Sequence, residues 1–125
     1  MFISVVTLPV KDVDRAIEFY TTRLGWVKTN DVSTEQGRWV TVAPNEGKTA
    51  ALTLTDYEPD KVGGRKGIIV EVDDVFSTHE DFSSKGVEFE SEPQTMPWGG
   101  YAEFKDSEGN ILGLHSSASV NVSSN

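Results

Sequence analysis

Apolar and polar residues follow one another along this chain in the order of a strand, a helix and three strands. Residues 3–8 are rich in β-branched side chains, which predicts a strand. Apolar residues then recur at helical spacing between Asp12, which suits a helix N-cap, and Gly25, which suits the position after a helix. Three further strands are predicted for residues 26–31, 38–43 and 50–55. The first part of the chain is therefore expected to form a βαβββ module.

The second part of the chain repeats this order. A strand is predicted for residues 67–72, a helix for 74–86, and strands for 87–91, 101–105 and 111–115. Asp12 and Asp74 lie 62 residues apart, as do Gly47 and Gly109 in the late turns. Two copies are too few for a solenoid and predict two similar modules in an α+β fold. We expect a single domain at residues 1–118, made of module one (1–57), a connector (58–65) and module two (66–118), followed by a loose tail at 119–125.

Side chains alternate between the two faces of a strand, so the pattern also sorts residues by face. One face of each predicted sheet is apolar and should pack under the helix, through residues such as Leu8, Val42 and Leu112. The other face mixes small, aromatic and polar side chains, which suits a small organic ligand in a cavity between the modules. The residues expected to contact this ligand are Thr7, Trp39, Thr41, Thr53, Ile69, Trp98, Tyr101, Glu103 and His115.

The composition narrows the classes of partner. The 125 residues are 37% hydrophobic and 25% charged, and they include no cysteine. This excludes disulfides, thiolate metal sites and a cysteine nucleophile, and it agrees with a reducing cytoplasm. The net charge of −9 disfavours nucleic acid and anionic membranes, and it indicates either a cationic ligand or simply solubility. No apolar run approaches the roughly 20 residues that span a bilayer, and the first residues lack a basic leader. We therefore expect a cytoplasmic protein.

Several short motifs resemble those of the vicinal oxygen chelate superfamily, which includes glyoxalase I, extradiol dioxygenases, fosfomycin-resistance enzymes and bleomycin-resistance proteins. The stretches that carry the resemblance read TLPVKD at 7–12, AIEFY at 16–20, LGW at 24–26, PWGGYAEF at 97–104 and DSEGN at 106–110. The resemblance covers residues 1–116 and implies paired βαβββ modules that form cupped mixed sheets, commonly in a homodimer. It does not choose a function, because one fold hosts many chemistries.

The metal-dependent members of this superfamily hold a divalent ion with His and Glu side chains from the first and fourth strands of each module. Carried onto this chain by the resemblance and the 62-residue repeat, the four positions are Val5, Ala51, Gly67 and Gly113. None of them offers the imidazole or carboxylate that such ions require. The expectation is therefore no metal and no cofactor, as in the metal-free binding members of the superfamily.

Three polar residues expected on the open face keep an enzymatic alternative in view. Tyr101, Glu103 and His115 could carry acid–base chemistry, while His115 could instead lie near solvent at a strand end and Glu103 at a sheet edge. His79 lies on the apolar helix face and is expected to pack. Two hypotheses follow: a metal-independent binding protein for a small molecule, and a glyoxalase- or dioxygenase-like enzyme that uses Glu103 and His115 or atypical metal ligands.

Overall fold

The computed structural model describes residues 1–47 and 49–117. The chain divides into two compact units, each presented by itself. The first comprises Met1–Arg65 together with Ser107–Gly109, and the second comprises Lys66–Asp106 and the residues from Asn110 onward. The predicted loose tail at 119–125 lies outside the described residues, and the predicted domain bounds remain predictions.

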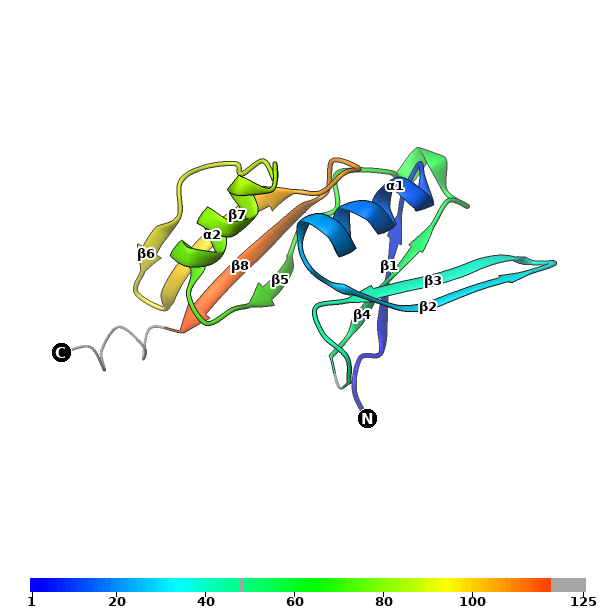
Figure 1. Cartoon of the computed structure of the whole chain (residues 1–125), viewed down its shortest axis with the longest axis horizontal. Helices are drawn as coiled ribbons and strands as arrows, with labels where there is room; N and C mark the ends of the chain where they lie inside the picture. The colour runs from blue at the N-terminus through cyan, green and yellow to red at the C-terminus, as the bar shows by residue number, and fades with distance from the viewer. Residues whose placement is uncertain (48, 118–125) are drawn as a thin grey trace. The chain divides into compact units, whose positions relative to one another are not determined.

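The first unit is a four-stranded mixed sheet with one helix on its face (Figure 1). Its outer strand β1 pairs in parallel with β4, and the remaining pairs are antiparallel. Because β1 and β4 are parallel neighbours, a crossover connection must join them, and here the helix and two strands supply it. The strand order is β1 (Val5–Pro9), β4 (Ala51–Thr55), β3 (Gly37–Ala43) and β2 (Val27–Thr34).

The helix of this unit begins where the sequence predicts. Asp12 caps α1 (Val13–Glu18), because its side chain accepts a hydrogen bond of 3.0 Å from the backbone nitrogen of Arg15. The helix continues as the π-helical turn η1 (Phe19–Arg23), and Gly25 then takes a φ of 76°, which favours glycine. A short 3-10 helix, η2 (Pro59–Lys61), lies in the connector that follows β4.

The second unit repeats the architecture of the first. Asp74 caps α2 (Val75–Ser84) by accepting from the backbone nitrogen of Phe76 at 3.0 Å. Outer strand β5 pairs in parallel with β8, and the other two pairs are antiparallel. The strand order is β5 (Ile68–Glu71), β8 (Ile111–Ser117), β7 (Gly99–Lys105) and β6 (Gln94–Met96). The predicted α+β fold of two βαβββ modules is confirmed.

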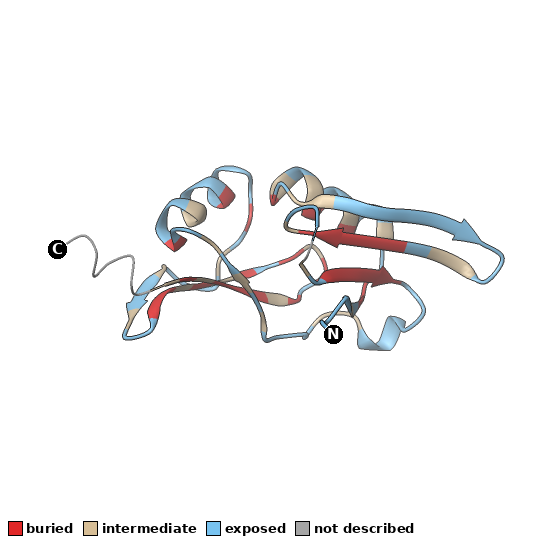
Figure 2. Cartoon of the chain, turned by 90° about the horizontal axis from the view of Figure 1, so that it is seen from below, coloured by how far each residue is buried: buried red, intermediate tan, exposed pale blue. Residues whose placement is uncertain are grey.

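The core of each unit lies between its helix and the apolar face of its sheet (Figure 2). Leu8, Val42 and Leu54 are buried in the first unit, and Phe104 and Leu112 in the second. Burial of one such side chain stabilises a fold by about 1.5–3 kcal/mol. Among the described residues, no helix is long and apolar enough to cross a membrane.

One predicted strand is wrong. Residues 87–91 form only an isolated bridge, between Phe89 and Phe104, and the regular strand β6 begins three residues later at Gln94. The backbone hydrogen bonds of Glu88 and Glu90 to β7 are made, at 2.9 Å each, but Pro93 then interrupts the segment. Proline cannot donate to a ladder, so the regular pairing starts after it.

Candidate functional site

The open face of the first sheet, on the side away from α1, contains a cavity of about 250 Å³. Trp39 and Thr41 of β3 line it together with Val5 of β1 and Ala51 of β4. The outer strand β2 contributes Thr29 and Asn30, so all four strands take part. Trp39 is 45% exposed, which leaves much of its indole available to a ligand. Val5, Trp39, Thr41 and Ala51 all lie on the face that the alternation of side chains along the strands predicts to be open.

A row of hydroxyl groups crosses this face. Thr7, Thr53 and Thr41 are register partners on three neighbouring strands. The hydroxyl of Thr41 lies 2.5 Å from that of Thr29 and accepts from the amide of Asn30 at 3.2 Å. The Thr53 hydroxyl is buried and has no hydrogen-bonding partner among the described residues. A buried hydroxyl without a partner is costly, so Thr53 is a place where a bound water or ligand atom would gain a hydrogen bond.

The open face of the second sheet carries a different, more acidic group. The phenol of Tyr101 donates to Oε2 of Glu103 at 3.1 Å, and the ammonium of Lys66 lies 4.0 Å from Oε1 of the same carboxylate. Partial burial, followed by the bond to Glu103, raises the pKa of Tyr101 above its ordinary value of 10.0. Tyr101 is therefore a neutral hydrogen-bond donor at physiological pH, and not a base.

His115 of β8 lies beside this group and links two other elements. Its Nδ1 lies 2.6 Å from Oε1 of Glu71 in β5, and its Nε2 lies 3.1 Å from the backbone oxygen of Trp98. The hydrogen bond to Glu71, and after it the one to Trp98, raise the pKa of His115 above 6.5. Trp98 itself is 58% exposed in the turn between β6 and β7.

The strand registers differ between the two modules at the four positions that the resemblance assigns to a metal, and that assignment stays a prediction. Val5 is opposite Ala51 in the first sheet as expected, but Ile69, and not Gly67, is opposite Gly113 in the second. The difference arises in the connection before the last strand of each module. Thr41 pairs with Thr53 in the first sheet, and Glu103 pairs with Gly113 in the second, so the β3–β4 connection is two residues longer than the β7–β8 connection. Ile69 cannot ligate a metal either, so the chemical conclusion does not change.

Gly113 is covered by Tyr101. A Cβ atom at Gly113 would lie 2.8 Å from the phenolic oxygen of Tyr101 and 3.2 Å from two of its ring carbons. The tyrosine ring thus occupies the space that a ligating side chain from this position would need. Among the residues that the structure describes, no group of three or more His, Cys, Asp or Glu side chains could hold a metal ion.

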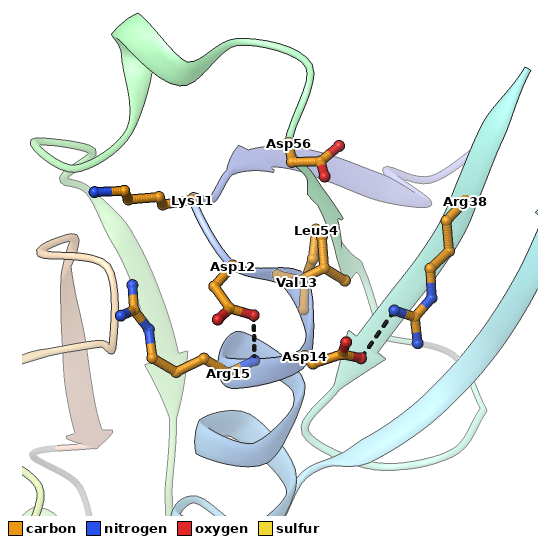
Figure 3. A pocket seen from close by; sticks show the side chains of 8 residues that line it. All are labelled: Lys11, Asp12, Val13, Asp14, Arg15, Arg38, Leu54 and Asp56. Carbon is orange, nitrogen blue, oxygen red and sulfur yellow. Dashed lines mark hydrogen bonds and ion pairs between the residues drawn. The ribbon is translucent and has the colours of Figure 1, made fainter.

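A second, larger cavity of about 450 Å³ lies where α1 begins (Figure 3), and sequence reasoning did not single it out. Asp14 and Arg38 form one wall through a 2.8 Å ion pair, and Lys11 and Asp56 also line the cavity. Arg38 bonds Asp31 as well, and these bonds hold the pKa of Asp31 well below its usual range. The alternating charges of residues 11–15 in the sequence could have indicated a polar site here. With its charges largely paired, this cavity is a polar surface hollow.

The predicted site residues form two groups, one on each sheet. Thr7, Trp39, Thr41 and Thr53 share the open face of the first sheet, while Ile69, Trp98, Tyr101, Glu103 and His115 belong to the second unit. His79 packs against Phe89, with ring centroids 4.4 Å apart, as its place on the apolar helix face predicts. The bond between His115 and Glu71 was not predicted from the sequence.

Two βαβββ units, each with an open polar-aromatic face, define the class of protein, and comparison with known proteins agrees. The chain belongs to the Glyoxalase/Bleomycin resistance protein/Dioxygenase superfamily, whose family model matches residues 2–114. Two curated relatives are uncharacterized proteins of Bacillus subtilis (strain 168). YurT is 34% identical over 90% of this chain and 96% of its own length, and YetH is 32% identical over 88% and 93%.

Solved structures give the same family. TnmS3, an antibiotic binding protein from Streptomyces sp. CB03234, has a TM-score of 0.86 at 31% identity, covering 94% of this chain and 97% of its own. A superfamily member from Sphaerobacter thermophilus DSM 20745 has a TM-score of 0.84 at 29% identity, covering 94% and 98%. The similarity extends over nearly the whole of each chain, so both modules share in it.

Proposed function

We propose that this chain is a metal-independent small-molecule-binding protein that holds its ligand against the open faces of its sheets. The observation that carries the proposal is the pair formed by Gly113 and Tyr101. The resemblance carries one of the superfamily's metal-ligand positions onto Gly113, which has no side chain, and the ring of Tyr101 lies where one would extend. The similarity to an antibiotic binding protein supports an organic ligand.

The chemistry of the open faces supports an aromatic or planar ligand. Trp39 offers a large exposed ring beside a cavity of about 250 Å³, and threonine hydroxyls and the Asn30 amide supply hydrogen bonds near it. A few polar groups placed within an aromatic or apolar lining are typical of small-molecule sites. Stacking on an aromatic ring is worth about 0.5–1.5 kcal/mol beyond the area that it buries.

Mass spectrometry of the protein purified without denaturation tests this function directly. We expect a co-purifying organic molecule, or saturable binding of a member of an antibiotic library, with no divalent ion required. A protein that gains affinity for organic molecules only after one equivalent of metal is added would overturn the metal-independent function.

A second function is favoured by one specific observation, the hydrogen bond from Tyr101 to Glu103. A carboxylate held by a phenol on an open sheet face could serve as the base of an acid–base enzyme of the superfamily. The two functions differ in outcome: a binding protein returns its ligand unchanged, whereas an enzyme releases a product of different mass. Loss of turnover with retained binding in Glu103→Gln would identify the enzyme.

We further propose that the chain is a cytoplasmic homodimer. The β2–β3 ribbon supports this assembly, because Val32 and Trp39 are register partners there and both are exposed. Val32 lies on the outer strand β2 and Trp39 on its neighbour β3, and exposed apolar side chains at the edge of a sheet are typical of a surface that another chain covers. Light scattering at micromolar concentration should give twice the 13.7 kDa of one chain, and a mass of one chain would count against the dimer.

A further inference from the structure

The ring of His115 has a hydrogen-bonding partner at each nitrogen, and both partners are acceptors. One is the carboxylate of Glu71, 2.6 Å from Nδ1, and the other is the backbone carbonyl of Trp98, 3.1 Å from Nε2. A carbonyl oxygen has no proton to donate, and an ionised carboxylate only accepts hydrogen bonds. Both contacts are hydrogen bonds only when both ring nitrogens donate, which is the arrangement of an imidazolium.

The charged groups around His115 agree with a cation at this position. Glu71 is its register partner in β5. On the other side, the register of β7 places the neutral Tyr101 opposite His115. The phenol of Tyr101 donates to Glu103, and the ammonium of Lys66 lies beside that carboxylate. Strand β6 consists of uncharged residues, and α2, with His79, covers the opposite face of the sheet. The nearest ionisable partner is thus an anion.

We propose that protonated His115 is a clamp that fixes the Pro97–Trp98 turn and so positions Trp98. A neutral imidazole has a single N–H to give. Glu71, the charged and closer acceptor, keeps that proton at Nδ1, because hydrogen bonds between charged groups are about twice as strong as neutral ones. Nε2 then presents a lone pair to the carbonyl of Trp98, and this contact changes from attractive to repulsive.

The position of the turn in the sheet makes it sensitive to this change. It joins β7 to β6, a strand of three residues at the edge of the sheet, and Trp98 is largely exposed. Strand pairing holds the two ends of the turn, through Met96 with Gly99 and Gly99 with Ser117, and does not reach its tip. Losing the bond to His115 should therefore free the tip, which contains Trp98. If Trp98 contacts the ligand, which rests on the proposed function, binding should weaken as pH rises through the pKa of His115.

Acrylamide quenching of Trp98 fluorescence tests the clamp without any ligand. The chain has three tryptophans, so Trp26→Phe with Trp39→Phe leaves Trp98 as the single emitter. Between about pH 5 and pH 9, where a histidine is the residue that titrates, we expect quenching to rise in one step. Its midpoint should lie above 6.5, in the direction in which Glu71 shifts the pKa of His115. Nitrogen-detected NMR should show both ring nitrogens protonated below the midpoint.

Three substitutions in the single-tryptophan background separate the clamp from other titrations. His115→Gln should abolish the step, and Glu71→Gln should lower its midpoint by about one pH unit, since it removes the neighbouring anion. His79→Gln is the matched control, because the chain has two histidines, and it should leave the step unchanged. No step, a step that survives His115→Gln, or a midpoint at or below 6.5 would overturn the clamp. If the quenching step is present but the protein binds no small molecule, the clamp stands and only the proposed function is refuted.

Discussion

Glu108, in the turn between β7 and β8, forms a partly buried ion pair with Arg15 of α1, 93 residues earlier in the chain. Its Oε2 accepts from Nη2 of Arg15 at 2.6 Å and from Nε at 2.9 Å. Its Oε1 accepts from the backbone nitrogen of Lys11 at 2.5 Å. The Glu108 side chain is 0% exposed, and Ser107–Gly109 belong to the first unit. One carboxylate therefore fixes both the approach to α1 and its first turn.

Glu108→Ala should lower the stability of the protein by about 2 kcal/mol, in the range typical of hydrogen bonds to charged groups. The free energy of unfolding, measured with denaturant and an unchanged m-value, checks this. Glu46 is the matched control, because it lies 62 residues earlier in the corresponding turn and is exposed. Glu46→Ala should change the stability by less than about 0.5 kcal/mol. Equal effects at the two positions would show that the buried contacts of Glu108 contribute nothing.

Divalent metal ions should neither copurify with this protein nor stabilise it. The resemblance assigns the metal-ligand positions to the first and fourth strands of each module. The residues paired there are Val5 with Ala51 and Ile69 with Gly113, and none of these side chains offers an atom that could coordinate a metal. Since a ligand raises the melting temperature only by binding the native state, Zn²⁺, Ni²⁺, Mn²⁺ and Fe²⁺ should leave it unchanged. Elemental analysis after dialysis without chelator checks the prediction, and about one equivalent of metal would contradict it.

Gly113→Ala should displace the ring of Tyr101, because the added methyl group would lie 2.8 Å from the phenolic oxygen. We expect a loss of stability of about 1 kcal/mol, within the range for overpacking. The displaced phenol should lose its bond to Glu103, so spectroscopic titration should show the raised pKa of Tyr101 falling toward 10.0. In a Tyr101→Ala background the same glycine substitution should cost less, and additive effects would show that the two residues do not interact.

Trp39→Ala should weaken the binding of an aromatic ligand at least tenfold while leaving the fold intact. The indole lines the cavity on the first sheet and is half exposed, so its removal takes away stacking and contact area and little of the core. Titration calorimetry and a thermal melt measure the two effects separately. Trp26→Phe serves as the control, because Trp26 packs on Tyr20 with ring centroids 5.1 Å apart. A ligand bound equally well by Trp39→Ala does not use this face.

A group whose folded pKa is raised stabilises the protein most at low pH. For His115 this contribution should be complete below about 6.5, the ordinary value, and should be lost as pH rises through the higher folded value. Stability curves of the parent and His115→Gln should therefore converge as pH rises from neutral. Curves that stay parallel across this range would show that His115 is not titrating against Glu71.

Much of the fold could be predicted from the sequence, because the signals are local. The helix caps Asp12 and Asp74 act within one turn, so their effect is readable from a few neighbouring residues. The alternation of apolar and polar residues along β3 and β8 sorted core from open face, since the direction of a side chain on a strand follows from its parity. The family motifs are equally local and led to the correct superfamily.

Strand register and the partners of individual side chains were decided only by the tertiary structure. A difference of two residues between the β3–β4 and β7–β8 connections places Ile69 opposite Gly113, although the 62-residue repeat indicates Gly67. Glu108 could not be told from Glu46 by its motif, and nothing near His115 in sequence indicates Glu71 or Trp98. Such contacts depend on how strands distant in the chain align, and pairing between strands is set by loop lengths and packing over the whole sheet.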